Sequence, residues 1–176
     1  MLYTRKGDDG TSGLYGTKKR LPKNSTVYEA LGALDELNSL LGVARAHVTE
    51  KNQKISVARE LVKIQQCLFI IQAELAGAGK KVHTAHVKDA EKTIHDIEKR
   101  IVAPTSFVLP GNSKLSGLLD YARAMSRRVE RVVLNAKKDR KLSPETMQYL
   151  NRLSSLLYAL ARYEGTKRKK ELTPTY

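Results

Sequence analysis

The chain has 176 residues, of which 41% are hydrophobic and 28% are charged, and Cys67 is its only cysteine. This length and composition predict one soluble domain whose core needs no disulfide, in a reducing compartment. The apolar runs are far shorter than the roughly 20 residues that cross a bilayer, and the charged start lacks the apolar core of a signal peptide. We therefore expect a single domain over residues 1–176, cytoplasmic and without a membrane-spanning segment.

The formal net charge of +14 is compatible with nucleic-acid binding, because phosphate backbones attract basic surfaces. However, aromatic residues make up only 6% of the chain, which leaves few side chains on which bases can stack. The cations also lie in separate places, at Lys18–Arg20, Arg123–Arg131 and Lys167–Lys170, instead of along one stripe. We therefore expect no nucleic-acid partner, and we interpret residues 165–176 as a mobile, solvated tail.

Residues 1–25 predict an irregular loop, because glycines at positions 7, 10, 13 and 16 and Pro22 interrupt any periodic pattern. Glycine allows backbone N–H groups to approach an anion closely, and the neighbouring Lys6, Lys18, Lys19 and Lys23 supply positive charge. No Gly-x4-Gly-Lys-Ser/Thr sequence occurs, so a phosphate site in this loop differs from a P-loop.

Apolar residues recur at steps of three and four over five later segments, which predicts helices there. The expected helices cover about residues 26–48, 55–78, 86–100, 112–137 and 143–160. Ser25 or Thr26 can cap the first helix, and Ser143-Pro144 opens the fifth in the favoured cap-then-proline order. Long helices with short connections and no convincing strand pattern predict an all-α five-helix bundle.

The fourth expected helix carries a row of arginines. Arg123, Arg127 and Arg131 are spaced by four, which places them on one helix face. Glu130 follows Arg127 by three residues, so we expect it to pair with Arg127 and hold its rotamer. Arginine suits bidentate contact with phosphate. We interpret this row and the glycine-rich loop as two halves of one nucleotide site; the alternative is a solvated cationic face.

Two polar positions on other helices are candidates for the same site. Asp35 interrupts an apolar stretch of the first helix, and its carboxylate can neutralise an arginine within the chain or across an interface, or be a lone surface acid. Asn151 lies between Leu150 and Leu153, so we expect it to be partly buried. A buried amide needs hydrogen-bond partners, which can be neighbouring backbone or a ligand.

The remaining reactive side chains form no familiar constellation. The histidines at positions 47, 83, 86 and 95 have no metal-ligand spacing with cysteine or carboxylate partners. No Ser-His-Asp or Cys-His grouping is visible either. We therefore expect neither a protein-bound metal centre nor a hydrolytic nucleophile.

Five ordered segments resemble a known family. They are Tyr3–Gly13, Tyr28–Ser39, Phe107–Ser113, Ala122–Arg131 and Tyr149–Ser154. Together they are similar to the corrinoid adenosyltransferases of the propanediol-utilisation type, and the resemblance covers residues 3 to about 163. One departure is Asp120, which stands where a histidine is common in that family.

The resemblance implies transfer of the 5′-deoxyadenosyl group of ATP to the cobalt of cob(I)alamin, which forms adenosylcobalamin and inorganic triphosphate. It also implies Mg²⁺ with the ATP, a homotrimer of five-helix bundles, and active sites where subunits meet. The expected partners are a corrinoid reductase or a cobalamin-dependent enzyme that receives the product. The alternative is an ATP-binding sensor or accessory protein of the same fold without transferase activity.

The resemblance also assigns residues. Residues 1–25 become an ATP-binding loop, in which the triphosphate is wrapped by Thr4, Arg5, Lys6, Gly7, Ser12, Gly13 and Lys23. From the fourth and fifth helices the nucleotide is bound by Arg127, Arg128, Glu130, Arg131 and Asn151. Asp35 and Arg123 match a pair that bridges subunits, and Phe107 matches the aromatic residue that closes the lower face of the corrin ring.

Overall fold

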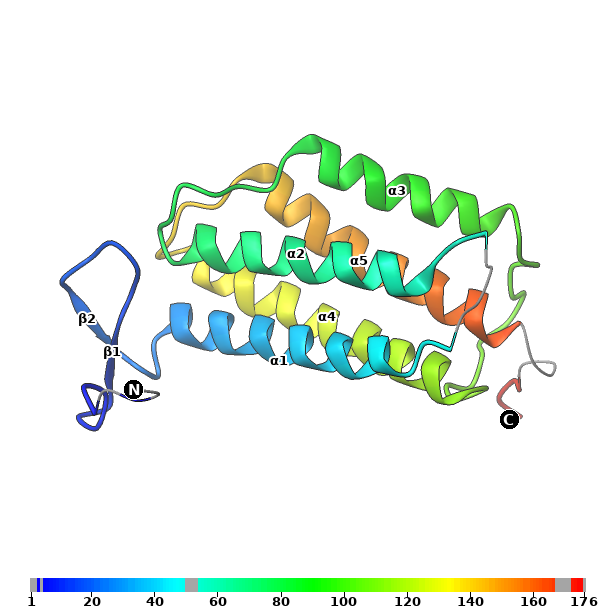
Figure 1. The fold of residues 1–176 in the computed structure, drawn as a ribbon, viewed down its shortest axis with the longest axis horizontal. Helices are drawn as coiled ribbons and strands as arrows, with labels where there is room; N and C mark the ends of the chain where they lie inside the picture. The colour runs from blue at the N-terminus through cyan, green and yellow to red at the C-terminus, as the bar shows by residue number, and fades with distance from the viewer. Residues whose placement is uncertain (1–2, 4, 50–53, 167–171, 176) are drawn as a thin grey trace.

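The computed structural model describes residues 3, 5–49, 54–166 and 172–175. In chain order, its elements are β1 (Thr11–Gly13), β2 (Arg20–Pro22), α1 (Thr26–Ala46), α2 (Val57–Leu75), α3 (Thr84–Glu98), α4 (Lys114–Ala136) and α5 (Pro144–Gly165). The helices run lengthwise beside one another, and the β1–β2 hairpin lies beyond the first turn of α1, at one end of the bundle (Figure 1). The expected all-α five-helix bundle is confirmed.

Local sequence explains where several helices begin. Ser113 precedes α4, and its side chain accepts a hydrogen bond from the backbone N–H of Ser116, which satisfies one of the free donors of the first turn. Pro144 opens α5, as expected. Ser25 precedes α1 without capping it, because its side chain accepts no bond from the helix. Thr26 instead donates its hydroxyl proton to Asp139 Oδ2 at 2.5 Å, which ties the start of α1 to the connection after α4.

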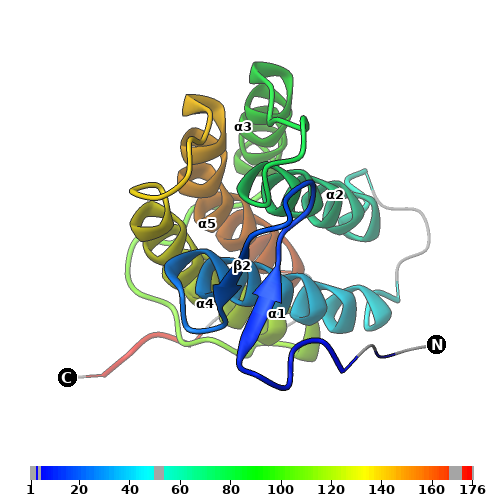
Figure 2. The same cartoon turned by 90° about the vertical axis from the view of Figure 1, so that its left-hand side faces the viewer.

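The helices pack in a fixed order around one core. α4 packs against both α1 and α5, α3 packs on α5, and α2 packs on α1, an arrangement visible from the hairpin end in Figure 2. The centre is filled by fully buried side chains that include Leu34, Leu37, Leu68, Leu119, Val129, Leu150 and Leu157. Because α4 lies between α1 and α5, its polar side chains emerge at the seams with those two helices.

The loop expected over residues 1–25 contains a short antiparallel hairpin, with Thr11 opposite Pro22 and Gly13 opposite Arg20. No helix in the described part of the chain is long and apolar enough to cross a membrane. At the other end of the chain, α5 continues to Gly165, and the Leu172 carbonyl accepts a hydrogen bond from the Leu109 N–H at 2.8 Å. Residues 167–171, which belong to the expected tail, lie outside the described residues.

Candidate functional site

A cavity of about 400 Å³ lies between α3, α4 and α5, and we call it the α3–α4–α5 cavity. Its apolar wall is formed mainly by Ile94, Ile97, Ile101, Pro104, Tyr158 and Ala159. Arg123 and Arg127 of α4 line the same cavity, so two members of the predicted arginine row face one space. An apolar wall beside two guanidinium groups suits a ligand that has both an apolar part and negative charge.

Buried groups support the arginines of this cavity. Asp120 is 4% exposed, and its carboxylate Oδ2 accepts a hydrogen bond from Arg162 Nη2, whose side chain is 2% exposed. The other carboxylate oxygen, Oδ1, lies 3.8 Å from Arg123 Nε. Burial raises the pKa of Asp120 above its ordinary value, while the charges of Arg162 and Arg123 oppose that shift. The carboxylate is therefore held between two arginines below the cavity surface.

The arginine row continues along α4 to Arg131, toward the C-terminal end of the helix. Arg131 donates from Nη1 to the backbone carbonyl of Arg127 at 2.9 Å, and the side chains of both residues are exposed. Arg127 and Arg131 are thus open to an anion at the surface of the bundle.

The pairing of Glu130 and the exposure of Asn151 both differ from what the sequence predicted. Glu130 forms no ion pair with Arg127 within the described residues; its Oε1 instead accepts a hydrogen bond from Asn151 Nδ2 at 3.2 Å. Asn151 is exposed, whereas partial burial was expected. Its Oδ1 accepts a bond from Arg152, which also binds Glu91 of α3. The reason is the rotation of α5, which turns Asn151 to the outer side of the α4–α5 seam, where Glu130 lies.

The neighbouring acids of α1, Asp35 and Glu36, have different surroundings. Glu36 Oε2 accepts a hydrogen bond from Arg128 Nη2 across the α1–α4 seam. Asp35 is exposed and has no ion pair to Arg123, or to any other cation, in the part of the chain that the structure places. Within one subunit, therefore, Glu36 neutralises an arginine of α4, and that arginine faces α1 rather than the α3–α4–α5 cavity.

The N-terminal loop is braced by its own side chains. Arg20 donates to Thr11 Oγ1 at 2.7 Å and to the Thr11 carbonyl at 2.9 Å, and also to the Lys6 carbonyl. Lys23 Nζ donates to the Gly7 carbonyl at 2.7 Å. Arg5 has a φ of 58°, a left-handed conformation that is rare outside glycine. Thr4, one of the predicted phosphate ligands, lies outside the described residues.

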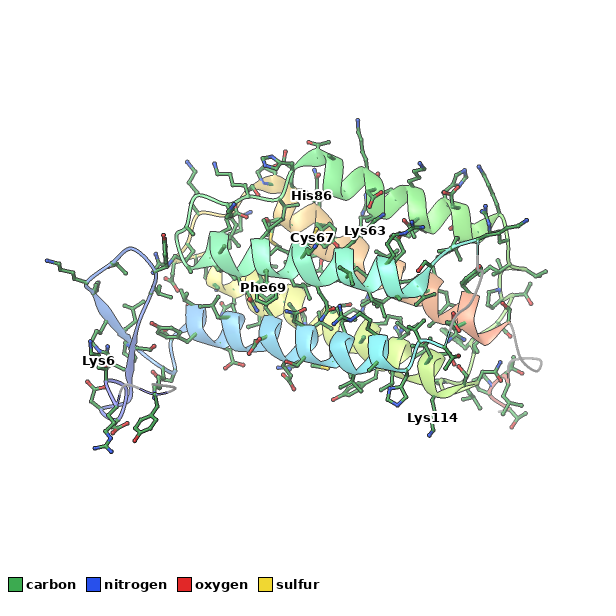
Figure 3. All side chains as sticks on the ribbon, in the orientation of Figure 1. Lys6, Lys63, Cys67, Phe69, His86 and Lys114 are labelled. Atoms are coloured by element: carbon green, nitrogen blue, oxygen red, sulfur yellow. The ribbon has the colours of Figure 1, made fainter. Side chains whose placement is uncertain are left out.

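Lys6, Gly7, Ser12, Gly13 and Lys23 are brought together in this loop, but the loop lies away from the arginine row of the same chain. Within the described ranges, no hydrogen bond or ion pair joins residues 5–23 to Arg123–Arg131. Figure 3 shows Lys6 in this loop, beyond the end of the bundle.

Phe107 lies apart from both the N-terminal loop and the arginine row. It lies between α3 and α4, in a segment at the end of the bundle opposite the hairpin (Figure 1), and its side chain is 77% exposed. A single chain thus presents the loop, the arginine row and Phe107 as separate parts.

Sequence reasoning missed three residues at this site. Arg162 and Tyr158 line the cavity, and the Arg162 guanidinium carbon lies 5.1 Å from the centroid of the Tyr158 ring. Glu36, which follows the candidate Asp35 and binds Arg128, was not among the predicted residues. The available signal was Arg162 itself, a cation within the apolar stretch Leu160-Ala161-Arg162, which needed a buried anion.

This fold and cavity define a helical-bundle protein with a cationic site for an anionic ligand. The family model described as cobalamin adenosyltransferase matches residues 2–164. The chain is 36% identical over 172 residues to a corrinoid adenosyltransferase of Citrobacter freundii, which covers 94% of this chain and 95% of that protein. It is 37% identical over 168 residues to a corrinoid adenosyltransferase of Bacillus subtilis (strain 168), covering 92% of this chain and 84% of that protein.

Solved structures agree with these sequence matches. Two variants of the PduO-type ATP:corrinoid adenosyltransferase from Lactobacillus reuteri superimpose with TM-scores of 0.89 and 0.90, at 27% and 28% identity. The first covers 100% of both chains and is complexed with cobalamin and ATP; the second covers 99% of this chain and 100% of that one and is complexed with ATP. The chain belongs to the cobalamin adenosyltransferase family, and the resemblance seen in its sequence is confirmed.

Proposed function

We propose that this enzyme transfers the 5′-deoxyadenosyl group of ATP to the cobalt of cob(I)alamin, releasing inorganic triphosphate. The observation that carries the proposal is the cavity lined by Arg123 and Arg127, in a chain that matches the family over residues 2–164. Two guanidinium groups beside an apolar wall suit a nucleotide, whose base and ribose are less polar than its phosphates.

The chemistry explains why cations are sufficient. The electron pair of Co(I) attacks the ribose C5′, a cobalt–carbon bond forms, and the C5′–O bond breaks with its electrons leaving on triphosphate. The substrate therefore supplies the nucleophile. The protein aligns C5′ with cobalt and stabilises the negative charge that develops on the leaving group. We assign that second task to Arg127 and Arg123, which both line the cavity.

We assign further contacts to the nucleotide to groups of α4 and α5 outside this cavity. Arg131 continues the row, and Glu130 with Asn151 forms a hydrogen-bonded pair at the α4–α5 seam that can orient the ribose or base. Arg128 completes the set from the α1 side of α4. Mg²⁺ enters with ATP, bound mainly by phosphate oxygens and water, a mode that demands few protein ligands.

The loop of residues 1–25 binds the triphosphate of a neighbouring subunit. Residues 5–23 lie beyond the end of the bundle of their own chain (Figure 1) and have no hydrogen bond or ion pair to its arginine row within the described residues, so we assign this contact to a second copy. This supports a homotrimer with active sites at the subunit interfaces. Asp35, which is exposed and unpaired with Arg123 in its own chain, then pairs with Arg123 of a neighbour.

Phe107 is assigned to the corrin ring. Phe107 is 77% exposed in one chain, and covering it with an apolar ligand is favourable because its apolar surface then leaves water. It lies against the lower face of the ring, excludes water there and leaves cobalt four-coordinate and easier to reduce. The proposed setting is the cytoplasm, with a corrinoid reductase or a cobalamin-dependent enzyme as partner.

The test is an incubation of the protein with ATP, Mg²⁺ and chemically reduced cobalamin. We expect the absorbance change of a new cobalt–carbon bond, with one triphosphate released for each adenosylcobalamin formed. Binding of ATP without that change would favour the alternative, a sensor or accessory protein of the same fold.

A further inference from the structure

Asp120 is the most enclosed carboxylate near the α3–α4–α5 cavity. It lies on the core side of α4 and is 4% exposed, and each of its oxygens faces a different arginine. Oδ2 accepts from Arg162 Nη2, and Oδ1 lies 3.8 Å from Arg123 Nε. A carboxylate in such surroundings persists only with cations close by, so the three side chains constrain one another.

Arg123 is the member of this group that reaches the cavity. Its Nε is enclosed and has no hydrogen-bond partner within the described ranges, yet the side chain is 34% exposed and lines the cavity. The guanidinium therefore has its inner edge toward Asp120 and its Nη end toward the cavity. A side chain held in this way loses less conformational entropy on binding than a free surface arginine.

Oδ2 of Asp120 connects it to the α5 wall of the cavity through Arg162. Arg162 belongs to α5, is 2% exposed, and lies under the ring of Tyr158 at 5.1 Å. Tyr158 is 38% exposed and lines the cavity together with Arg123. One carboxylate thus connects the arginine of α4 with the aromatic wall of α5.

We propose that Asp120 is a positioning residue for ATP, which acts through Arg123 by holding its guanidinium toward the α3–α4–α5 cavity. The inference rests on the proposed function, because it assigns the cavity to the nucleotide. It adds a residue that never touches the substrate, and it predicts that loss of Asp120 weakens ATP binding only while Arg123 is present.

The experiment removes the buried pair without leaving an isolated charge. Asp120→Leu and Arg162→Met are combined in the full chain, and Asp120→Asn, which keeps the side-chain volume and an acceptor oxygen, is measured beside this double variant. Thr146→Val is the control, since Thr146 is equally buried on α5 but binds Glu74, away from the cavity. Folding is followed by circular dichroism, ATP affinity by calorimetry, and KM and kcat by the cobalt–carbon absorbance.

We expect the folded pair variant to bind ATP about tenfold more weakly, because small displacements of a positioned group have costs of this size or larger. The Thr146→Val control should retain the parent affinity. In a chain that already carries Arg123→Ala, the same pair substitution should change ATP affinity little, since the two effects share one route.

Two results would overturn the proposal: unchanged ATP affinity in the folded Asp120 variants, or a loss of equal size with and without Arg123. Either would show that the buried pair serves only the core. Failure of the proposed function is a different result, in which the unsubstituted chain binds ATP but forms no cobalt–carbon bond, and the calorimetric comparison still stands.

Discussion

Lys23 Nζ donates to the carbonyl of Gly7 at 2.7 Å, and a Cβ on residue 7 would lie 3.1 Å from that nitrogen. The same Cβ would lie 3.2 Å from the Thr11 carbonyl, so the loop allows no side chain at this position without displacement. The close approach of Gly7 to Lys23 and Thr11 therefore fixes the shape of the predicted phosphate loop.

Gly7→Ala tests this relationship. We expect a several-fold rise in the KM for ATP, because Lys23 and the strand at Thr11 must shift, and an unchanged melting temperature, because the loop lies outside the core. Steady-state kinetics and thermal unfolding measure the two quantities. Gly79→Ala is the matched control, since a Cβ there meets open space. Equal kinetics for both variants would show that the loop shape does not matter for ATP.

Arg127→Ala should lower kcat by about 10²–10³-fold, the usual cost of removing one group that stabilises developing charge. Single-turnover rates with reduced cobalamin check this expectation. Arg100→Ala, a change of the same kind at an exposed residue beyond the end of α3, should leave the rate unaltered. Normal turnover by Arg127→Ala would exclude its role toward triphosphate.

Phe107→Ala should slow transfer while ATP affinity and folding stability stay near those of the parent. The ring is 77% exposed, so its removal leaves no core cavity, but water then reaches the lower cobalt face. Phe69, the other phenylalanine, is 59% exposed on α2 and is labelled in Figure 3; Phe69→Ala provides the comparison. A collapse of ATP affinity in Phe107→Ala would indicate a structural role.

Asp35→Asn and Glu36→Gln separate the two neighbouring acids. Asp35→Asn should weaken subunit association and slow turnover, as followed by sedimentation and kinetics. Glu36→Gln removes an exposed pair within the chain and should lower the free energy of unfolding by no more than about 1 kcal/mol. If Asp35→Asn assembles and turns over as the parent does, the proposed bridge to Arg123 is wrong.

Cys67 supplies a pH-dependent prediction. Burial raises the pKa of its thiol, and a hydrogen bond with Tyr149 only partly opposes that shift. The neutral thiol is thus favoured by folding, so this stabilisation is complete below the pKa of the unfolded thiol and is lost as pH rises through the folded value. At about pH 8.5, iodoacetamide should modify the folded chain far more slowly than the chain unfolded in guanidinium. Equal rates would contradict the enclosed position.

The helices could be predicted because their signals are local. Stripes such as Leu61, Ile64, Leu68 and Ile71 recur at helical steps and are buried in the structure, and Pro144 opens its helix as its fixed φ favours. The hairpin was missed because its strands have only three residues each, too few to show an alternating pattern, and because Arg20 of β2 bonds Thr11 of β1 across nine residues of sequence.

The partners of the site residues depended on how neighbouring helices are rotated. Spacing within α4 placed Glu130 near Arg127, but its hydrogen-bond partner is Asn151 of the neighbouring α5. Spacing within α1 likewise could not decide which of Asp35 and Glu36 reaches α4. Those choices are made between helices, where a one-dimensional pattern carries no information about rotation.

The bracing of residues 5–23 by Arg20 and Lys23 has a consequence for assembly. Because these bonds close within the segment, they hold its shape, and it can be presented to another copy already folded. In the proposed trimer, each subunit then presents its phosphate-binding loop to one neighbour and receives the loop of the other neighbour. A trimer that contains one subunit with a substituted loop and another with substituted α4 arginines would therefore still form one intact active site.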